Sequence, residues 1–156
     1  MKIGVLAVQG AFIEHEHIIE KIGHEVVEIR QRKDLDGIDG IILPGGESTV
    51  QGQLIRKLDM LATIKSLITD GLPTLATCAG LILLAGHIDN DDSIHIGTLP
   101  VTVKRNAYGR QLGSFVRTAP MKGFDKFPMT FIRAPYISSI KDNVDVLAAV
   151  DDRTVA

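Results

Sequence analysis

The chain has 156 residues, a net charge of −2 at pH 7 and 45% hydrophobic residues. This length suits a single domain over residues 1–156, and the apolar content predicts a folded core. Acidic and basic side chains are mixed without a basic stripe, which argues against a nucleic-acid partner. No apolar run reaches the roughly 20 residues of a membrane helix, so we expect no membrane insertion. One cysteine cannot form an internal disulfide, which fits a reducing, cytoplasmic setting.

Strand and helix patterns alternate through the first half of the chain. The opening apolar run is typical of a strand buried on both faces of a parallel sheet. Gly23 is placed to close the first helix, and Ser48 is placed to cap the second. The expected strands are 1–8, 24–30, 40–46 and 73–77, and the expected helices lie near 12–22, 48–57, 59–69 and 79–85.

The second half is richer in short β runs, at 99–105, 113–117, 129–133 and 144–150. We expect these runs to extend the sheet with antiparallel hairpins. The sequence therefore predicts an α/β fold: a mostly parallel central sheet flanked by helices, with added antiparallel β-strands in the C-terminal half. The last residues, 144–156, are typical of a hairpin whose second strand has barely begun. A short edge strand would explain this, but we favour a chain truncated at its C-terminus.

The one cysteine, Cys78, lies where the strand at 73–77 meets the next helix. Strand, Thr-Cys-Ala-Gly and helix is the layout of a nucleophile elbow, in which Ala76, Ala79 and Gly80 let backbones pass closely. N–H groups at the helix start favour a thiolate and can stabilise an oxyanion. A lone cysteine in an apolar run is more commonly a core residue, so this stretch alone leaves both interpretations open.

The sequence LPGGES, at 43–48, places two glycines between an expected strand and an expected helix. Such a loop is rich in exposed N–H groups, and an ordinary turn is the alternative. In an α/β fold the loop lies at the carboxyl ends of the strands, on the same edge as Cys78. This shared edge favours the interpretation of Cys78 as a nucleophile.

Two arginine-bearing segments fit the same edge: KRNAYGRQ at 104–111 and FIRAP at 131–135. An arginine offers a planar fork for a carboxylate. A pocket made of Glu47, Arg105 and Arg133 would therefore suit a zwitterionic amino acid. For either arginine alone, a solvated surface charge is the alternative.

The motifs LPGGES, TCAG, RNAYGRQ and FIRAP, in this order, resemble the glutaminase subunits of pyridoxal 5′-phosphate synthase. That family is a branch of the class I (triad-type) glutamine amidotransferases, which are flavodoxin-like. The opening VLAVQGAFIEH resembles theirs too, so the resemblance covers the whole chain. It implies hydrolysis of L-glutamine without a cofactor. The ammonia would pass to a synthase subunit, in a cytoplasmic hetero-oligomer that makes pyridoxal 5′-phosphate (vitamin B6).

The resemblance also implies roles for individual residues. Cys78 would be the nucleophile that forms a glutamyl thioester. Gly46 and Ala79 match the oxyanion-stabilising positions of the family, and Gln9 matches a position associated with activation by the synthase. The family's glutamine-binding residues match Gly46, Glu47, Ser48, Arg105, Ile132 and Arg133.

The chain departs from the family pattern in three places. The family triad ends in a His-Pro-Glu motif, and none of the five histidines here precedes Pro-Glu. The sequence orients none of them against Cys78, so we expect little glutaminase activity from these 156 residues alone. Ala76 stands where the family usually has glycine, and Gly113 where it usually has aspartate.

Two other functions stay open. A non-catalytic paralogue would bind glutamine or the synthase without turnover, and a thiol-reactive α/β protein would use Cys78 with Glu47 as its acid partner. We expect no metal site. The alternating acids and histidines at 14–17 would spread around a helix, and the acidic run at 89–92 lacks EF-hand spacing.

Overall fold

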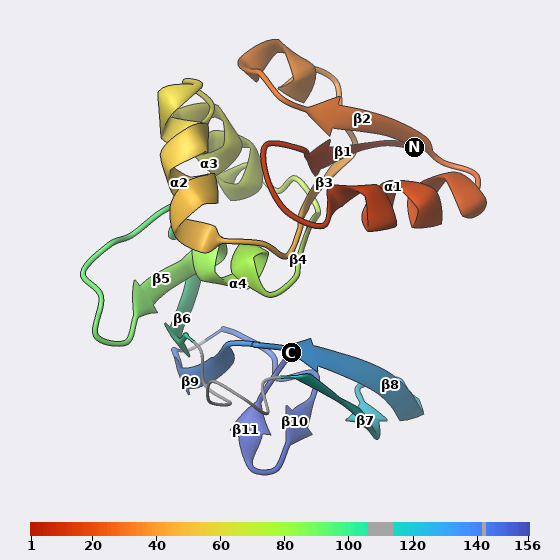
Figure 1. Ribbon diagram of the computed structural model, residues 1–156, viewed down its shortest axis with the longest axis vertical. Helices are drawn as coiled ribbons and strands as arrows, with labels where there is room; N and C mark the ends of the chain where they lie inside the picture. The colour runs from red at the N-terminus through yellow and green to blue at the C-terminus, as the bar shows by residue number, and fades with distance from the viewer. Residues whose placement is uncertain (106–113, 142) are drawn as a thin grey trace. The chain divides into compact units, whose positions relative to one another are not determined.

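The structure is a computed structural model that describes residues 1–105, 114–141 and 143–156 (Figure 1). The chain forms two compact units. The first unit comprises Met1–Leu84 and His95–Thr98, and the second comprises Ala85–Ile94 and Leu99–Ala156. Most of the RNAYGRQ segment, together with Gly113, lies outside the described residues.

The first unit contains a parallel sheet with the strand order β2-β1-β3-β4. Its strands are β1 (Lys2–Leu6), β2 (Glu25–Ile29), β3 (Gly40–Leu43) and β4 (Thr74–Ala76). Its helices are α1 (Phe12–Lys21), a 3-10 turn η1 (Arg32–Leu35), α2 (Ser48–Lys57), α3 (Leu61–Thr69) and α4 (Ala79–Leu84). Helix α1 packs against β1 and β2, whereas α4 packs against β3 and β4 (Figure 1).

Apolar residues of the strands and of α1 form the core of this sheet. Strand β3 is buried along its whole length because it lies between β1 and β4. Val5, Ile19 and Ile42 form one buried cluster, so strands β1 and β3 share a core with α1. This packing holds the carboxyl ends of β1 and β3 in place, and the loops of the candidate site begin there.

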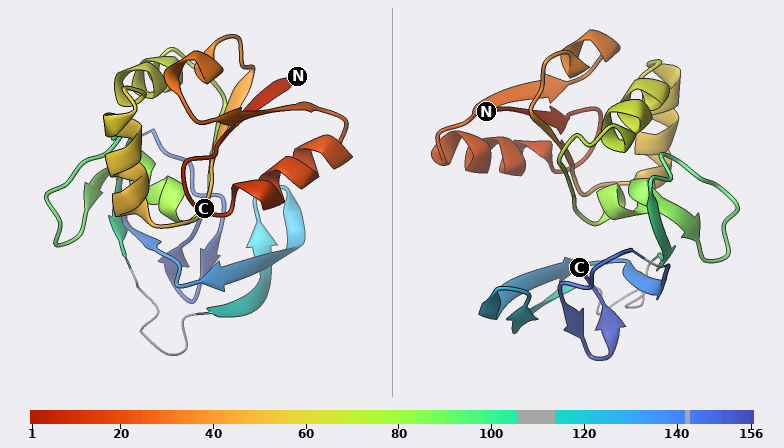
Figure 2. Two further views of the ribbon diagram at one scale, coloured as in Figure 1. Left: turned by 45° about the horizontal axis from the view of Figure 1, so that its top comes forward. Right: turned by 180° about the vertical axis from the view of Figure 1, so that it is seen from behind.

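The second unit has a sheet in the order β10-β11-β9-β6-β5 and a separate antiparallel hairpin, β7-β8. Strands β5 and β6 pair in parallel, and the other pairs are antiparallel. The long hairpin curves along its length (Figure 2), and Phe115 stacks on Phe131 across it with ring centroids 4.6 Å apart. The strands are β5 (Ala85–Ile88), β6 (Leu99–Lys104), β7 (Ser114–Met121), β8 (Phe124–Ile132), β9 (Tyr136–Ile140), β10 (Ala149–Val150) and β11 (Arg153–Thr154).

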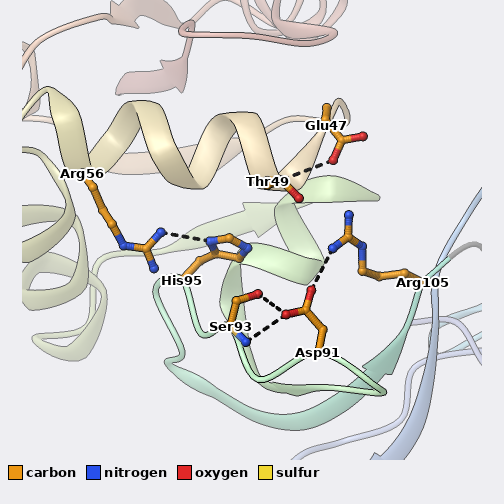
Figure 3. A network of polar contacts seen from close by, with 7 residues as sticks. All are labelled: Glu47, Thr49, Arg56, Asp91, Ser93, His95 and Arg105. Carbon is orange, nitrogen blue, oxygen red and sulfur yellow. Dashed lines mark hydrogen bonds and ion pairs between the residues drawn. The ribbon is translucent and has the colours of Figure 1, made fainter.

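The expected α/β fold, with a parallel sheet, flanking helices and added antiparallel strands, is confirmed. The added strands do not extend the parallel sheet as expected, because they pair among themselves in a second sheet and a hairpin. Two further local predictions are wrong. Glu47, not Ser48, caps α2, because Glu47 is the last residue with extended backbone and its Oε1 accepts from Thr49 N at 3.3 Å (Figure 3). The run 144–150 is a strand only at its last two residues, because its partner β11 is equally short. Among the described residues, no helix is long and apolar enough to cross a membrane.

Candidate active site

Cys78 lies in the first unit, at the turn between β4 and α4. Its backbone is left-handed, with φ of 49°, a conformation that costs a non-glycine residue about 1–2 kcal/mol and is frequent at functional sites. Gly80 N donates to Thr77 O at 2.8 Å, so the helix begins directly at the half-buried cysteine. This is the strand–nucleophile–helix geometry of the predicted elbow.

The elbow is packed tightly against β3. Thr77 N donates to Leu43 O at 3.0 Å. A Cβ atom built on Gly80 would lie 2.1 Å from the same carbonyl oxygen, a distance that no side chain tolerates. The prediction that small residues let backbones pass closely here is therefore confirmed at Gly80.

The glycine loop of the LPGGES motif passes beside the cysteine. A Cβ atom built on Gly45 would lie 3.6 Å from Cys78 Cβ. The loop also meets the turn that follows β1, where Ala11 N donates to Gly45 O at 2.9 Å. Gly10 has φ of 106°, and a Cβ atom there would lie 2.1 Å from Gly45 O, so the turn after β1 needs glycine where it touches the loop.

Gln9 joins the same two loops through its side chain. Its Oε1 atom accepts a hydrogen bond from Glu47 N at 2.9 Å. A Cβ atom on Gly46 would lie 2.5 Å from Gln9 Oε1 and 3.0 Å from Gly10 Cα, so a larger residue at position 46 would displace the Gln9 side chain. Ser48, the first residue of α2, is buried beside this junction. The first unit thus brings Gln9, Gly46 and Glu47 together.

Gln51 is part of this junction, and sequence reasoning missed it. The residue lies on α2 and is completely buried, with 0% of its surface exposed. Its Nε2 donates to Gln9 O at 2.9 Å and to Pro44 O at 3.3 Å. The available signal is positional: Ser48, Gln51 and Ile55 share the buried face of α2, so a polar amide stands at a core position.

A histidine also reaches the elbow from α1. His15 Nε2 lies 3.3 Å from the Thr77 hydroxyl, one residue before Cys78. Burial lowers the pKa of His15, with Glu14 acting in the opposite direction. The neutral imidazole is therefore favoured, and its Nε2 can accept a hydrogen bond from the Thr77 hydroxyl. From the sequence, no histidine could be placed next to Cys78. In the structure, His15 contacts Thr77, the residue directly before Cys78.

The second unit carries the remaining predicted residues, Arg105, Ile132 and Arg133. Arg105 Nη1 donates to Asp91 Oδ2 at 3.0 Å (Figure 3). Hydrogen bonds from Ser93, and then the Arg105 guanidinium, hold the pKa of Asp91 below its usual range. The arginine expected to bind a carboxylate thus already binds one of its own unit.

Arg133 and Ile132 lie at the end of β8. Arg133 follows the last residue of this strand and has a left-handed backbone with φ of 44°. Ile132 exposes 62% of its surface. Strained backbone conformations cluster at functional sites. The left-handed backbone therefore supports Arg133 as a candidate binding residue in addition to its position in the sequence. Within the described residues, no three His, Cys, Asp or Glu side chains are grouped to hold a metal.

The fold and the elbow define a class: an α/β protein with a cysteine at the carboxyl edge of a parallel sheet, beside a glycine loop. The chain belongs to the SNO glutamine amidotransferase family, whose model matches residues 5–156. A solved structure described as "Crystal structure of glutamine amidotransferase" matches with a TM-score of 0.93 and 38% identity, covering 98% of this chain and 82% of that chain. The predicted family and fold are therefore confirmed.

Curated relatives carry one name, pyridoxal 5′-phosphate synthase subunit PdxT. The protein of Desulfitobacterium hafniense (strain DSM 10664 / DCB-2) is 57% identical over 152 residues, which are 97% of this chain and 76% of the relative. The protein of Haemophilus influenzae (strain PittEE) is 53% identical, covering 100% of this chain and 83% of the relative. That of Streptococcus pneumoniae (strain CGSP14) is 52% identical, covering 100% and 82%.

Proposed function

We propose that this protein hydrolyses L-glutamine to glutamate and ammonia with Cys78 as its nucleophile. One observation carries the proposal. In a chain of the glutamine amidotransferase family, the only cysteine has a left-handed backbone at a strand–helix elbow and lies directly beside the glycine loop. A core cysteine needs neither the strained backbone nor the adjacent loop.

In the proposed reaction, the Cys78 thiolate attacks the carboxamide carbon of glutamine and the carbonyl electrons move onto the oxygen. The N–H groups of Gly46 and Ala79 would bind this oxyanion. When the intermediate collapses, the carbon–nitrogen bond breaks. The nitrogen takes a proton and leaves as ammonia, and a glutamyl thioester remains on sulfur. Water then attacks the thioester, which releases glutamate and restores the thiol.

The glutamine-binding assignments remain part of the proposal. Glu47 and Ser48 lie at the start of α2, next to the glycine loop, which supports their role. Arg105, Ile132 and Arg133 are carried by the family resemblance, and the left-handed backbone of Arg133 adds support.

We further propose that the chain acts as a single amidotransferase domain whose ammonia serves the synthesis of pyridoxal 5′-phosphate. The shared name of relatives that are 57% and 53% identical supports this assignment. The partner would be a synthase subunit in a hetero-oligomer, and Gln9 would take part in the response to it. The proposal places this assembly in the cytoplasm, which the single cysteine supports.

A chloroketone analogue of glutamine tests the nucleophile without requiring turnover, because the thiolate displaces chloride directly. We expect one adduct, located at Cys78 by peptide mass spectrometry and suppressed by excess L-glutamine. Cys78→Ser should give none. Iodoacetamide, which does not resemble glutamine, serves as the control for thiol reactivity. If excess L-glutamine does not reduce chloroketone labelling and peroxide readily oxidises Cys78, the proposal is overturned in favour of a thiol-reactive protein.

A further inference from the structure

We propose that Gln51 is a positioning residue for glutamine hydrolysis: its buried amide joins the Gln9 turn to the Pro44–Gly46 loop beside the nucleophile. The inference rests on the proposed function and deepens it. Gln51 lies on α2 and would act indirectly. Its side chain holds the Pro44–Gly46 loop, which carries the proposed oxyanion N–H group of Gly46, and the Gln9 turn that meets this loop.

The side chain of Gln51 donates two hydrogen bonds. Nε2 has two protons, and each is directed at a different loop: one to Gln9 O at 2.9 Å, the other to Pro44 O at 3.3 Å. The main chain of Gln51 is fixed as well, since its N–H donates to Glu47 O at 2.9 Å. A single side chain therefore ties the start of α2 to both loops.

The orientation of the amide is unambiguous, because a reversed amide would place Oε1 against two carbonyl oxygens. Oε1 itself is buried and has no hydrogen-bond donor among the described residues. An unpaired buried polar atom costs about 1–3 kcal/mol. An apolar residue at this position would avoid that cost, so what distinguishes glutamine here is its pair of donors.

Gly46 lies close to the amide of Gln51. A Cβ atom built on Gly46 would lie 2.9 Å from Gln51 Nε2 and 2.5 Å from Gln9 Oε1. Pro44, whose carbonyl oxygen accepts from Gln51, is two residues before Gly46, so loss of the amide would release the segment that positions Gly46. Gly46 supplies one of the proposed oxyanion N–H groups, and such groups act only when they are held in place before reaction.

The test compares two rate constants for Cys78 in the full 156-residue chain: that with the chloroketone analogue of glutamine and that with iodoacetamide. The ratio reports the glutamine-recognising geometry, because thiol exposure and thiolate content affect both reagents. Gln51→Leu removes both donors while keeping an apolar side chain of similar length. We expect its ratio to fall about tenfold or more, since small displacements at reacting centres have effects of this size.

Gln51→Glu adds a second test, because a purely structural role of Gln51 would not make the ratio of the two rate constants depend on pH. At pH 8 its carboxylate would face two carbonyl oxygens, whereas at pH 5.5 the protonated acid can donate to one of them. Relative to the wild type at the same pH, we expect a deficit of about tenfold at pH 8 that shrinks to about threefold or less at pH 5.5. This comparison decides the question alone if Gln51→Leu does not fold.

Gln53 provides the matched control, since it is a glutamine on the same helix whose side chain is exposed. Gln53→Leu and Gln53→Glu should leave the ratio unchanged at both pH values. An unchanged ratio in Gln51→Leu, or a pH-independent deficit in Gln51→Glu, overturns the positioning role alone. A wild-type chain that reacts with the analogue no more selectively than with iodoacetamide overturns the proposed function, and this inference falls with it.

Discussion

At the scale of single residues, Thr77 links helix α1 to Cys78, the proposed nucleophile. Its N–H and its carbonyl are both used by the elbow, toward Leu43 and Gly80. Its hydroxyl lies 3.3 Å from His15 Nε2. A Cβ atom on Gly45 would lie 4.0 Å from that hydroxyl oxygen, so the glycine loop closes over it. The His15 imidazole thus contacts the residue directly before Cys78.

The charge state of His15 gives a prediction about stability. Burial lowers the pKa of His15 in the folded chain from its ordinary value of 6.5. As pH falls below that value, the unfolded chain binds the proton more readily, and the free energy of unfolding decreases. In His15→Gln this contribution is absent. We therefore expect a shallower decline of stability between pH 7 and pH 5, measured by urea denaturation at closely spaced pH values.

The control is His17→Gln, because His17 is an exposed histidine on the same helix. Its pH dependence should follow that of the wild type. If His15→Gln and the wild type decline with equal slopes, the burial of His15 has no influence on its protonation and the prediction fails.

Sequence predicts the parts of the site that depend on neighbours along the chain. The elbow at Cys78 and the glycine loop are local patterns of small residues between a strand and a helix, so they are visible in one dimension. Gln51 and His15 act across 42 and 62 residues, respectively. Their roles depend on which helix face is buried against which loop, and that is decided by tertiary packing.

At the scale of elements, helix α2 packs closely against His95 of the same unit. His95 is buried, with 7% of its surface exposed, and its Nδ1 lies 3.4 Å from Arg56 Nη1 (Figure 3). A Cβ atom on Gly52 would lie 2.0 Å from His95 Nδ1. The imidazole therefore occupies the space that any other residue at position 52 would need.

A double-mutant cycle tests this fit. Gly52→Ala raises helix propensity by about 1 kcal/mol, yet the clash with His95 should make the variant less stable by about 1–3 kcal/mol. In a His95→Ala background the added methyl group has room, so the same change should be neutral or stabilising. Thermal or urea unfolding of the four proteins gives the coupling energy, which we expect to be about 1–3 kcal/mol.

The matched control is Gly80→Ala, in which the added methyl group meets the main-chain oxygen of Leu43 instead of a side chain. This variant should stay destabilised in the His95→Ala background. Additive free energies for Gly52→Ala and His95→Ala would show that the imidazole moves aside at no cost, against the proposed fit.

Elements with strong local patterns are predictable, and those defined by distant pairing are not. The alternation of apolar runs and glycines predicts the strands and helices of the first unit closely. Strand β5 follows α4 with no break in the chain, so its residues look like one more helical turn. Strand β9 exists because it pairs with β6 and β11, although Ser138 and Ser139 give it a polar composition. The left-handed pair Asp151–Asp152 directs the short β10-β11 hairpin.

At the scale of the whole molecule, the two units hold different parts of the proposed chemistry. The first unit contains the proposed nucleophile, Cys78, with both glycine-bearing loops, and the second contains Arg105 and Arg133. Activation of a thiol needs the elbow alone, whereas proton delivery to the leaving nitrogen needs a general acid. Reaction with an electrophile and turnover of glutamine are therefore separable properties of this polypeptide.

The last prediction exploits that separation. Chloroketone labelling of Cys78 needs no general acid, whereas glutamate release does. His15 Nε2 lies 3.3 Å from the hydroxyl of Thr77, the residue before Cys78. If the His15 imidazole moves the proton, His15→Gln should lower glutamate release by about 10²–10⁴-fold and leave chloroketone labelling unchanged.

The control is His17→Gln, since His17 is an exposed histidine on the same helix. This variant should release glutamate at the wild-type rate. Equal glutamate release by His15→Gln and the wild type would mean that another residue moves the proton. A loss of chloroketone labelling in His15→Gln would instead mean that the substitution disturbs the elbow.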